Sequence, residues 1–433
     1  MDKFVIDGGR PLHGTVRIQG SKNASLPMMA SALLLEPGEK LVLRGVPQLE
    51  DVKTMITLLG KLGVRTSRIG DSLTLLAVND TPIEAPYDIV KKMRASICVL
   101  GPLVGRRRAA RVSQPGGCII GVRPVDLHVR GLAQLGASII QQHGYLVAQA
   151  RRLIGRTIYL GGPFGSTVTG TENVLMAAVL AQGTTVIECA ACEPEVQTLA
   201  HLLNAMGAKI QGIGSPRLIV HGVRRLHGSQ ATIIPDRIEA GTFLAAAAIT
   251  GGDVRIENCV PDHMVAVLES FRSAGVHIEA QPDSMRVMSN GLFKPVDVTT
   301  LPYPGFPTDM QAQFMALMSL GDGITILTEK IYPDRFLHVA ELMRMGAHIR
   351  KEGSCAIVAG VDSLHGAEVM ASDLRASACL VVAALAAEGT TEIHRVYHLD
   401  RGYDHIERRL NALGARVRRI PEEKEAIVMR EAV

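Results

Sequence analysis

The sequence contains no tryptophan, and phenylalanine and tyrosine together make up only 3% of its 433 residues. Proteins that stack nucleic-acid bases or anchor at membrane interfaces rely on aromatic side chains, so both classes lose support. An uninterrupted apolar run of about 20 residues, which a membrane-spanning helix requires, is missing as well. The composition therefore predicts neither a nucleic-acid partner nor a membrane partner.

Cysteine is also scarce, with seven residues in the chain. So few thiols are typical of a reducing compartment rather than of a disulfide scaffold. Cys189 and Cys192 form a CxxC pair, but no second pair or histidine pair accompanies them, so we expect neither a metal site nor a redox role. Asp2 and Asp7 stand where a signal peptide would have basic and then apolar residues. These features predict a cytoplasmic protein.

Neither sign of charge dominates, because 46 basic residues face 42 acidic ones and the net charge is +4. This excess is too small to indicate a nucleic-acid-binding protein, although it is compatible with small anionic ligands. A nucleic-acid-binding protein built on a related repeat is the alternative from another class, which a salt titration against DNA or RNA would test. With 47% hydrophobic residues the chain can bury a core, and its length suggests about two to three domains.

A repeat of about 70 residues organises the chain. In each copy a helical apolar pattern ends at a glycine, and a small residue and an alternating, strand-like stretch follow. The six glycines, spaced by 73, 71, 68, 71 and 68 residues, are Gly63, Gly136, Gly207, Gly275, Gly346 and Gly414. A second series of expected helix ends runs in phase with them, near Gly38, Gly105, Gly183, Gly252, Gly323 and Gly389.

Six such α/β units predict two domains of three units each, with helices inside and sheets around them. No linker rich in proline or serine separates the halves, so the phase of the repeat places the boundary near residues 233–235. The run Arg106–Arg108 is expected to be a solvated turn.

The first helix of each unit is predicted to start at a comparable phase, at residues 20–23, 93–96, 170–173, 237–240, 309–311 and 374–377. A helix N-terminus carries free N–H groups and a partial positive charge, so converging starts would attract an anion. Lys22, Arg94 and Arg375 would add full charges there. Each arginine could instead pair locally on the surface, but several in matching phase favour an anion site. Without ligand, such like charges are expected to repel and to hold a cleft open.

Two loops carry candidate catalytic groups. Cys118 lies in a glycine-rich loop with Arg123 nearby, which makes it a candidate reactive thiol, although an incidental loop cysteine is the interpretation that chemistry alone favours. The turn Pro304–Asp309 delivers Asp309 to a helix start, where it either caps the helix or accepts a proton. Arg335 and Arg401 lie in loops that follow strands of the fifth and sixth units.

Several of these stretches resemble the enolpyruvyl transferases that act on UDP-N-acetylglucosamine, from the first strand to about Arg419. The motifs are Ser21-Lys22-Asn23, Met93-Arg94-Ala95-Ser96, Gly117–His128, Phe306-Pro307-Thr308-Asp309-Met310-Gln311 and Asp373-Leu374-Arg375-Ala376. The resemblance implies an α/β fold, the two-domain inside-out α/β barrel, with six repeated βαβαββ units, three per domain. It implies a first domain of residues 22–234 and a second of residues 1–21 plus 235–433.

The activity that the resemblance implies is transfer of enolpyruvate from phosphoenolpyruvate to the 3-hydroxyl of UDP-N-acetylglucosamine, with release of phosphate. This is the first committed step of peptidoglycan synthesis, and it needs no cofactor, no metal and no obligate protein partner. A sister enzyme acting on shikimate phosphate lacks the cysteine loop and the Arg-Pro-Val-Asp-Leu stretch found here at 123–127. A paralogue acting on another uridine nucleotide stays open, because the segment 160–171 is long and rich in glycine.

The resemblance also implies roles for individual residues. Cys118 would donate a proton, Asp309 would accept the hydroxyl proton, and Asp373 would be an acid near the reacting centre. The residues implied around the phosphate and carboxylate of phosphoenolpyruvate are Lys22, Arg123, Arg335, Arg375 and Arg401. Those implied to contact the sugar, uracil or diphosphate are Asn23, Arg94, Asp309, Pro124, Val125, Asp126, Leu127, Ile331, Thr167 and Val168.

Overall fold

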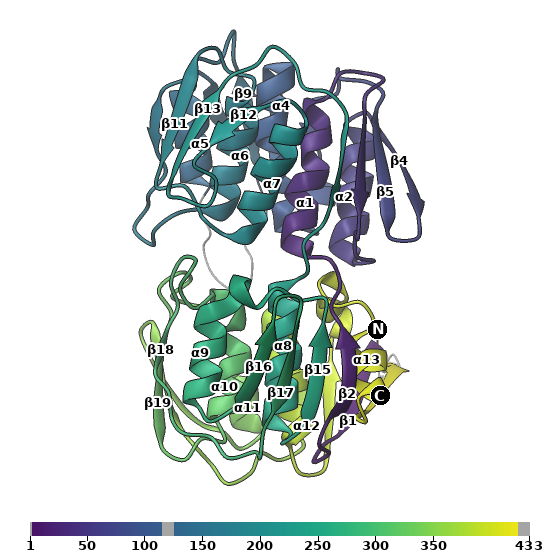
Figure 1. Cartoon of the computed structure of the whole chain (residues 1–433), viewed down its shortest axis with the longest axis vertical. Helices are drawn as coiled ribbons and strands as arrows, with labels where there is room; N and C mark the ends of the chain where they lie inside the picture. Colours follow the sequence, from purple (N-terminus) through teal and green to yellow (C-terminus); the bar gives the residue numbers. More distant parts are fainter. Residues whose placement is uncertain (1, 115–124, 423–433) are drawn as a thin grey trace, which may run out of the picture.

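The computed structural model describes residues 2–114 and 125–422, so Cys118, Arg123 and Pro124 lie outside the described residues. Figure 1 shows two lobes stacked along the long axis of the molecule. The first lobe runs from α1 to β14, and the second holds β1, β2 and everything from α8 onward. The first described strand, β1, and the last, β24, both lie in the second lobe, although β1 and β2 precede the first lobe in the sequence.

The described strands form six four-stranded sheets, three in each lobe. In the first lobe the sheets are, in spatial order, β14 (Ser229–Thr232), β3 (Lys40–Arg44), β5 (Ser72–Ala77), β4 (Val64–Ile69); β6 (Glu84–Ala85), β7 (Ala109–Ser113), β9 (Tyr145–Gln149), β8 (Ser138–Gln142); and β10 (Thr157–Tyr159), β11 (Thr184–Glu188), β13 (Arg217–His221), β12 (Lys209–Gln211). In the second lobe they are β2 (His13–Arg17), β15 (Asp253–Glu257), β17 (Ser284–Met288), β16 (His277–Gln281); β18 (Val298–Thr299), β19 (Ile324–Thr328), β21 (Cys355–Ala359), β20 (His348–Glu352); and β22 (Glu368–Met370), β23 (Thr390–His394), β1 (Asp2–Asp7), β24 (Arg416–Pro421). In every sheet the first pair is parallel and the remaining pairs are antiparallel, as a βαβαββ unit requires.

Helices connect and line these sheets. Those of the first lobe are α1 (Lys22–Ala30), η1 (Ser31–Leu34), α2 (Glu50–Lys61), α3 (Tyr87–Val90), η2 (Arg94–Val99), α4 (Leu100–Arg107), α5 (Asp126–Gln134), α6 (Val168–Ala178) and α7 (Pro194–Ala205). Those of the second lobe are α8 (Arg237–Ile249), η3 (Pro261–Met264), α9 (Val265–Ser273), η4 (Thr308–Met310), α10 (Gln311–Met318), α11 (His338–Arg344), α12 (Leu374–Ala386), η5 (Val396–Arg401) and α13 (Ile406–Ala412).

The first helix of a unit lies inside its lobe. In α8 every residue from Ile238 to Ile249 is buried, and in α12 so is every residue from Leu374 to Leu385. A helix that is apolar on all sides must be surrounded by protein, whereas strands such as β15 and β19 alternate buried and accessible residues. The prediction of helices inside and sheets outside is therefore confirmed.

The six glycines of the first series all have positive φ angles, between 83° and 107°, and each follows a helix. Only glycine adopts this conformation without strain, which explains why the repeat marks it. In the second series Gly105 does not end its helix, because α4 continues to Arg107 and Arg108 takes the left-handed conformation with φ 58°. A Cβ at Gly105 would lie 3.1 Å from Ala177 of α6, so this glycine serves close helix packing instead.

The expectation of a solvated arginine turn at Arg106–Arg108 is also wrong. Arg107 lies in the last turn of α4 and donates to the carbonyl oxygens of Leu62 and Asn79, while Arg108 donates to that of Leu180. Burial lowers the pKa of Arg107 to about 10. These side chains tie the end of one buried helix to neighbouring units.

The chain crosses between the lobes twice, and the two crossings lie side by side. Ser21 N donates to Ile234 O at 2.7 Å, and Asp236 N donates to Gln19 O at 2.9 Å. The crossing lets β2 complete a sheet with β15 and lets β14 complete one with β3. Buried hydrophobic residues form one cluster within 24–233 and another within 4–18 and 238–417. These clusters support the domain limits 22–234 and 1–21 plus 235–433, which stay a prediction.

Candidate active site

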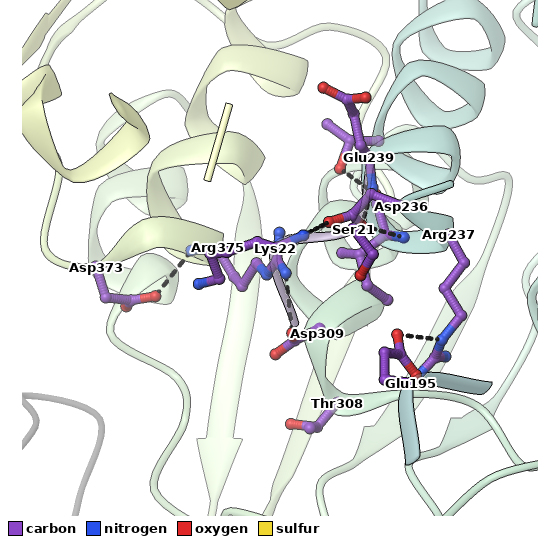
Figure 2. A network of polar contacts seen from close by, with 12 residues as sticks. Ser21, Lys22, Glu195, Asp236, Arg237, Glu239, Thr308, Asp309, Asp373 and Arg375 are labelled. Carbon is purple, nitrogen blue, oxygen red and sulfur yellow. Dashed lines mark hydrogen bonds and ion pairs between the residues drawn. The ribbon is translucent and has the colours of Figure 1, made fainter. Parts of the chain in front are cut away.

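The two crossings bring the start of α1 against the start of α8. Asp236, the N-cap of α8, accepts the backbone N–H groups of Ile238 and Glu239 through Oδ1. Its other oxygen accepts the backbone N–H of Lys22 at 3.1 Å, which Figure 2 shows. One carboxylate thus caps two helices from different lobes and fixes where the Lys22 side chain begins.

A second carboxylate lies between cations from both lobes. Asp51 of α2 has only 3% of its surface exposed, and its Oδ2 lies 3.4 Å from Lys22 Nζ. Arg401, at the end of η5 in the second lobe, places Nε 3.0 Å from Asp51 Oδ1. Burial lowers the pKa of the Lys22 ammonium, although Asp51 opposes that shift. A lysine held this way gives up its proton more readily than an exposed one.

A third carboxylate joins two arginines of the second lobe. Asp309 Oδ1 accepts Arg335 Nη1 at 2.8 Å, and Asp309 Oδ2 accepts Arg375 Nη2 at 3.0 Å. Figure 2 shows Asp309 below Arg375, with the dashed contact between them. Burial by itself would raise the pKa of Asp309, but Arg375 and Arg335 outweigh it and hold the pKa well below its usual range. Asp309 is therefore a carboxylate whose negative charge is shared by two guanidinium groups.

Asp309 is not a helix cap. Pro307 occupies the N-cap of η4, and no side chain caps that turn. The cap in this region is Asp373, whose Oδ1 accepts the N–H groups of Arg375 and Ala376 at the start of α12. Asp373 thereby orients the first turn of the helix that carries Arg375.

Arg375 is held on its other side as well. Its Nη1 donates to the hydroxyl of Tyr403 at 3.1 Å, and that hydroxyl lies 2.8 Å from Thr242 Oγ1. With 3% exposure, Arg375 makes these contacts inside the protein. A buried guanidinium in a fixed position presents its N–H donors in one plane. This arrangement suits the binding of a phosphate or a carboxylate.

The predicted convergence of basic residues is thus found, but the expectation of like charges facing each other alone is wrong. Asp51 and Asp309 lie among Lys22, Arg335, Arg375 and Arg401 and neutralise part of their charge. Arg401 of the second lobe pairs with Asp51 of the first. The two lobes are therefore joined by an ion pair, whereas the prediction was that like charges would hold them apart.

Comparison with known proteins gives this arrangement its context. A model of the EPSP synthase (3-phosphoshikimate 1-carboxyvinyltransferase) family matches residues 6–410. The UDP-N-acetylglucosamine 1-carboxyvinyltransferase of Koribacter versatilis is 55% identical over 426 residues, which cover 98% of this chain and 97% of the relative. The protein of the same name from Desulfatibacillum aliphaticivorans is 50% identical over 420 residues, covering 97% and 100%. The chain belongs to the EPSP synthase family.

The motif resemblance to enolpyruvyl transferases is thereby confirmed, and the protein is an enzyme of this transferase family. Among solved structures, an enolpyruvyl transferase from Streptomyces tendae matches with a TM-score of 0.87 at 24% identity, covering 96% of this chain and 98% of that one. EPSP synthase from Acinetobacter baumannii matches with a TM-score of 0.72 at 18% identity, covering 97% and 100%. These likenesses confirm the predicted two-domain inside-out α/β fold.

In this transferase several of the residues expected to bind a nucleotide lie at the starts of first-lobe helices, whereas Ile331 follows β19 in the second lobe. Asn23 follows Lys22 in α1, Arg94 begins η2, and Asp126 and Leu127 begin α5, preceded by Val125. His128 of α5 lies 3.0 Å from Thr169 of α6. Among the described residues these helix starts lie in one lobe, and their nucleotide-binding role stays a prediction.

The long glycine-rich segment packs against both α5 and the second lobe. A Cβ at Gly162 would lie 3.1 Å from Leu127, and one at Gly165 would lie 2.8 Å from Pro302. Helix α6 begins at Val168, not at residue 170 as predicted, and Thr167 caps it by accepting the Gly170 N–H at 3.3 Å. Thr167 and Val168 thus lie at a helix N-terminus that follows the segment.

Sequence reasoning missed Asp51 and Asp236. Asp51 shares the buried face of α2 with Val52 and Met55, so an acidic residue on an apolar helix face was the available signal. Asp236 directly precedes Arg237, where α8 begins, and its position marked it as a cap. Its contact with the Lys22 N–H of the other lobe depends on where the chain crosses between the lobes, and nothing in the neighbouring sequence indicates it.

The described residues offer neither a membrane-spanning helix nor a metal site. No helix in the part of the chain that the structure describes is long and apolar enough to cross a membrane. Within residues 2–114 and 125–422, no three histidine, cysteine, aspartate or glutamate side chains are grouped so that they could hold a metal ion.

Proposed function

We propose that the enzyme transfers the enolpyruvyl group of phosphoenolpyruvate to the 3-hydroxyl of UDP-N-acetylglucosamine and releases phosphate. The observation that carries this proposal is the set of cations that meets Asp309 and Asp51 from two lobes: Lys22, Arg335, Arg375 and Arg401. The relatives at 50–55% identity are named for UDP-N-acetylglucosamine, which is a sugar nucleotide. Phosphoenolpyruvate, the second substrate in this proposal, is a small dianion or trianion. Both therefore match a buried cationic centre.

Phosphoenolpyruvate would take the place of the carboxylates that now pair with these cations. Its phosphate and carboxylate each offer pairs of acceptor oxygens to Arg335, Arg375 and Arg401, which suits bidentate hydrogen bonding. As the arginines turn to the substrate, Asp309 loses the partners that hold its pKa down. Substrate binding would therefore make Asp309 a better base at the moment when a base is needed.

The proposed reaction is an addition followed by an elimination. Cys118, outside the described residues, would protonate the vinyl CH2 carbon, and the 3-hydroxyl oxygen would bond to the adjacent carbon while Asp309 takes its proton. The resulting tetrahedral ketal still carries the phosphate. Loss of a proton from the new methyl group re-forms the double bond as the carbon–oxygen bond to phosphate breaks. Lys22 and the arginines would stabilise the charge on the departing phosphate.

The remaining residues have supporting roles in this proposal. Asp373 orients Arg375 through the start of α12. Arg123 would join the residues around phosphoenolpyruvate. The residues that would hold the sugar nucleotide are Asn23, Arg94, Pro124, Val125, Asp126, Leu127, Thr167, Val168 and Ile331. No residue in this scheme needs a metal or organic cofactor.

The product of this reaction is a precursor of peptidoglycan, so we place the enzyme in cell-wall biogenesis, with cell shape and division depending on it. We propose the cytoplasm as its compartment. The described cysteines, which are all free thiols, support this proposal.

Phosphate release tests the proposal directly. We expect phosphate from phosphoenolpyruvate only when UDP-N-acetylglucosamine is present, with a carboxyvinyl ether as the second product by mass spectrometry. Shikimate 3-phosphate and other uridine nucleotide sugars serve as competing acceptors. Faster release with one of these acceptors would assign the enzyme to a different substrate.

Cys118 is tested separately by covalent labelling. Fosfomycin is an epoxide phosphonate that resembles phosphoenolpyruvate, and we expect it to alkylate Cys118 faster in the presence of UDP-N-acetylglucosamine. Peptide mapping identifies the labelled residue. A label on Cys189 or Cys192, or no label at all, would overturn the role proposed for Cys118.

A further inference from the structure

Glu329 is a buried carboxylate that neither the motifs nor the proposed mechanism uses. It follows β19, none of its surface is exposed, and its two oxygens accept four hydrogen bonds. Oε1 accepts the hydroxyl of Thr300 at 2.7 Å and the backbone N–H groups of Ile331 and Tyr332 at 2.8 and 2.9 Å. Oε2 accepts the hydroxyl of Thr308 at 2.8 Å. Only a group that accepts at both oxygens satisfies these four donors.

The contact with Thr308 extends to the reacting centre. A threonine hydroxyl has one hydrogen, and Thr308 uses it towards Glu329, so its lone pairs face other donors. Arg335 Nη1 donates to Thr308 Oγ1 at 3.0 Å and to Asp309 Oδ1 at 2.8 Å. The hydroxyl therefore fixes where the Arg335 guanidinium lies, and Glu329 fixes the direction of the hydroxyl.

The other three contacts shape the turn that leads to Arg335. Thr300 donates its hydroxyl to Glu329 and accepts the Lys330 N–H at 2.9 Å. The N–H groups of Ile331 and Tyr332 close around the same carboxylate oxygen. The turn that carries Ile331 and Arg335 is thus folded about one side chain, which also joins it to η4.

From this geometry we infer that Glu329 is a positioning residue of the active site. It aligns Arg335 with Asp309 through the Thr308 hydroxyl, and it holds the turn of residues 330–332. The inference rests on the proposed function, in which Arg335 binds phosphoenolpyruvate. Glu329 touches neither Asp309 nor Arg335 in the described contacts, so it acts through Thr308.

Three variants separate this role from a merely structural one. Glu329→Gln replaces an acceptor oxygen by an NH2 group, which cannot accept from the hydroxyl or the amides. Thr308→Val breaks only the link to Arg335, and Thr300→Val breaks only the link to the turn, with similar side-chain volumes. A hydrogen bond that orients a charged group changes affinity by about tenfold.

We expect Glu329→Gln and Thr308→Val each to lower kcat/KM for phosphoenolpyruvate by about tenfold or more, and Thr300→Val by less than about threefold. The double variant of Glu329 and Thr308 should be no worse than Glu329→Gln alone, because both changes break one chain of contacts. Additive losses, or Glu329→Gln with wild-type kcat/KM, would overturn the inference. If Glu329→Gln does not fold, Thr308→Val decides: equal losses for Thr308→Val and Thr300→Val would overturn it.

Failure of the proposed function gives a different result. In that case the wild-type enzyme releases no phosphate, and calorimetric titration of phosphoenolpyruvate into wild-type and Thr308→Val protein replaces the kinetic assay. About tenfold weaker binding by the variant would support the positioning role, since the hydroxyl aligns Arg335. Equal binding would overturn it.

Discussion

Asp309 and Glu329 are two carboxylates that are linked through Thr308 and Arg335. Their surroundings differ in charge and in exposure to solvent. Asp309 faces two guanidinium groups, and 24% of its side chain is exposed. Glu329 is fully buried and faces two hydroxyls and two backbone N–H groups.

The two carboxylates differ in whether their hydrogen-bond donors can change partners. Arginine side chains can leave Asp309 for an anionic substrate, because solvent reaches the pair and each guanidinium has further donors. The donors to Glu329 belong to the backbone and to short side chains, which cannot turn elsewhere without unfolding the turn. Asp309 therefore combines partial exposure with charged partners, as a reacting group requires, whereas Glu329 combines full burial with neutral donors, as a positioning group requires.

The largest expected effect comes from breaking the charged half of this comparison. Asp309→Asn removes the proposed base, so turnover should fall about 10²–10⁴-fold. A capping role alone would limit the loss of unfolding free energy to about 1 kcal/mol. Because Asp309 instead separates two buried arginines, we expect a loss of about 3 kcal/mol in chemical denaturation.

Inorganic phosphate should restore more stability to Asp309→Asn than to the wild type, because it supplies the missing anion between Arg335 and Arg375. Asp253→Asn is the matched control, since Asp253 pairs with Arg286 on the surface. Near-normal turnover of Asp309→Asn would remove the base assignment, and equal stabilisation by phosphate would remove the proposed anion site.

A smaller effect is expected at the carboxylate that joins the lobes. Asp51→Asn leaves Lys22 and Arg401 without their shared anion, which should cost about 2 kcal/mol of unfolding free energy. The lobes should also separate, and small-angle scattering of the ligand-free protein would then show a larger radius of gyration. An unchanged scattering profile would argue that other contacts hold the lobes together.

His338 differs from both carboxylates, because it is a buried titratable group that is uncharged at neutral pH. Burial lowers its pKa to about 4, with Arg335 lowering it further and Asp373 opposing the shift. The unfolded chain binds the proton near pH 6.5 and the folded one only near pH 4, so stability is full above pH 6.5 and falls as the pH drops.

Between pH 7 and pH 5 this histidine should remove about 2 kcal/mol of unfolding free energy. His338→Gln has no group that titrates there, so its stability should vary less with pH by about that amount. Denaturant unfolding of both proteins at several pH values measures the difference. Parallel pH curves would show that the pKa of His338 is the same in the folded and the unfolded chain, and would overturn the prediction.

The smallest effect is expected one residue before Asp51. Glu50 pairs with Lys53 on the exposed side of α2, where both side chains are more than half exposed. Glu50→Gln should therefore change the unfolding free energy by only about 0.3 kcal/mol, and high salt should erase the difference. A loss as large as that of Asp51→Asn would mean that helix electrostatics, and not the contact between lobes, explains both.

The sequence predicted the elements that repeat. Gly63 and its five counterparts marked helix ends, because a left-handed residue after a helix is a local requirement that glycine meets. A helix also ends near Gly105, as predicted, but there the left-handed residue is Arg108 and the glycine is required for close packing against α6. A single sequence does not distinguish a glycine needed for its φ angle from one needed for its missing side chain.

The residues of the candidate site also fall into those that local sequence predicts and those that only tertiary contacts reveal. The motifs singled out Lys22, Asp309 and Arg375 because residue type and helix phase are written locally. Asp51 and Glu329 were missed, since each is an acidic residue in an apolar stretch whose partners come from other elements.

The sequence by itself determined the six-unit repeat, the family and the basic residues of the centre. Tertiary structure alone decided which carboxylate each cation meets: Asp51 joins Lys22 to Arg401, 350 residues away from it in the chain, and Asp236 links α8 to α1. Helix ends and glycine turns follow from interactions within a few residues, which the sequence records directly. Ion pairs and hydrogen bonds between lobes depend on where the chain crosses twice, and they join residues so far apart in the chain that no local stretch of sequence records them.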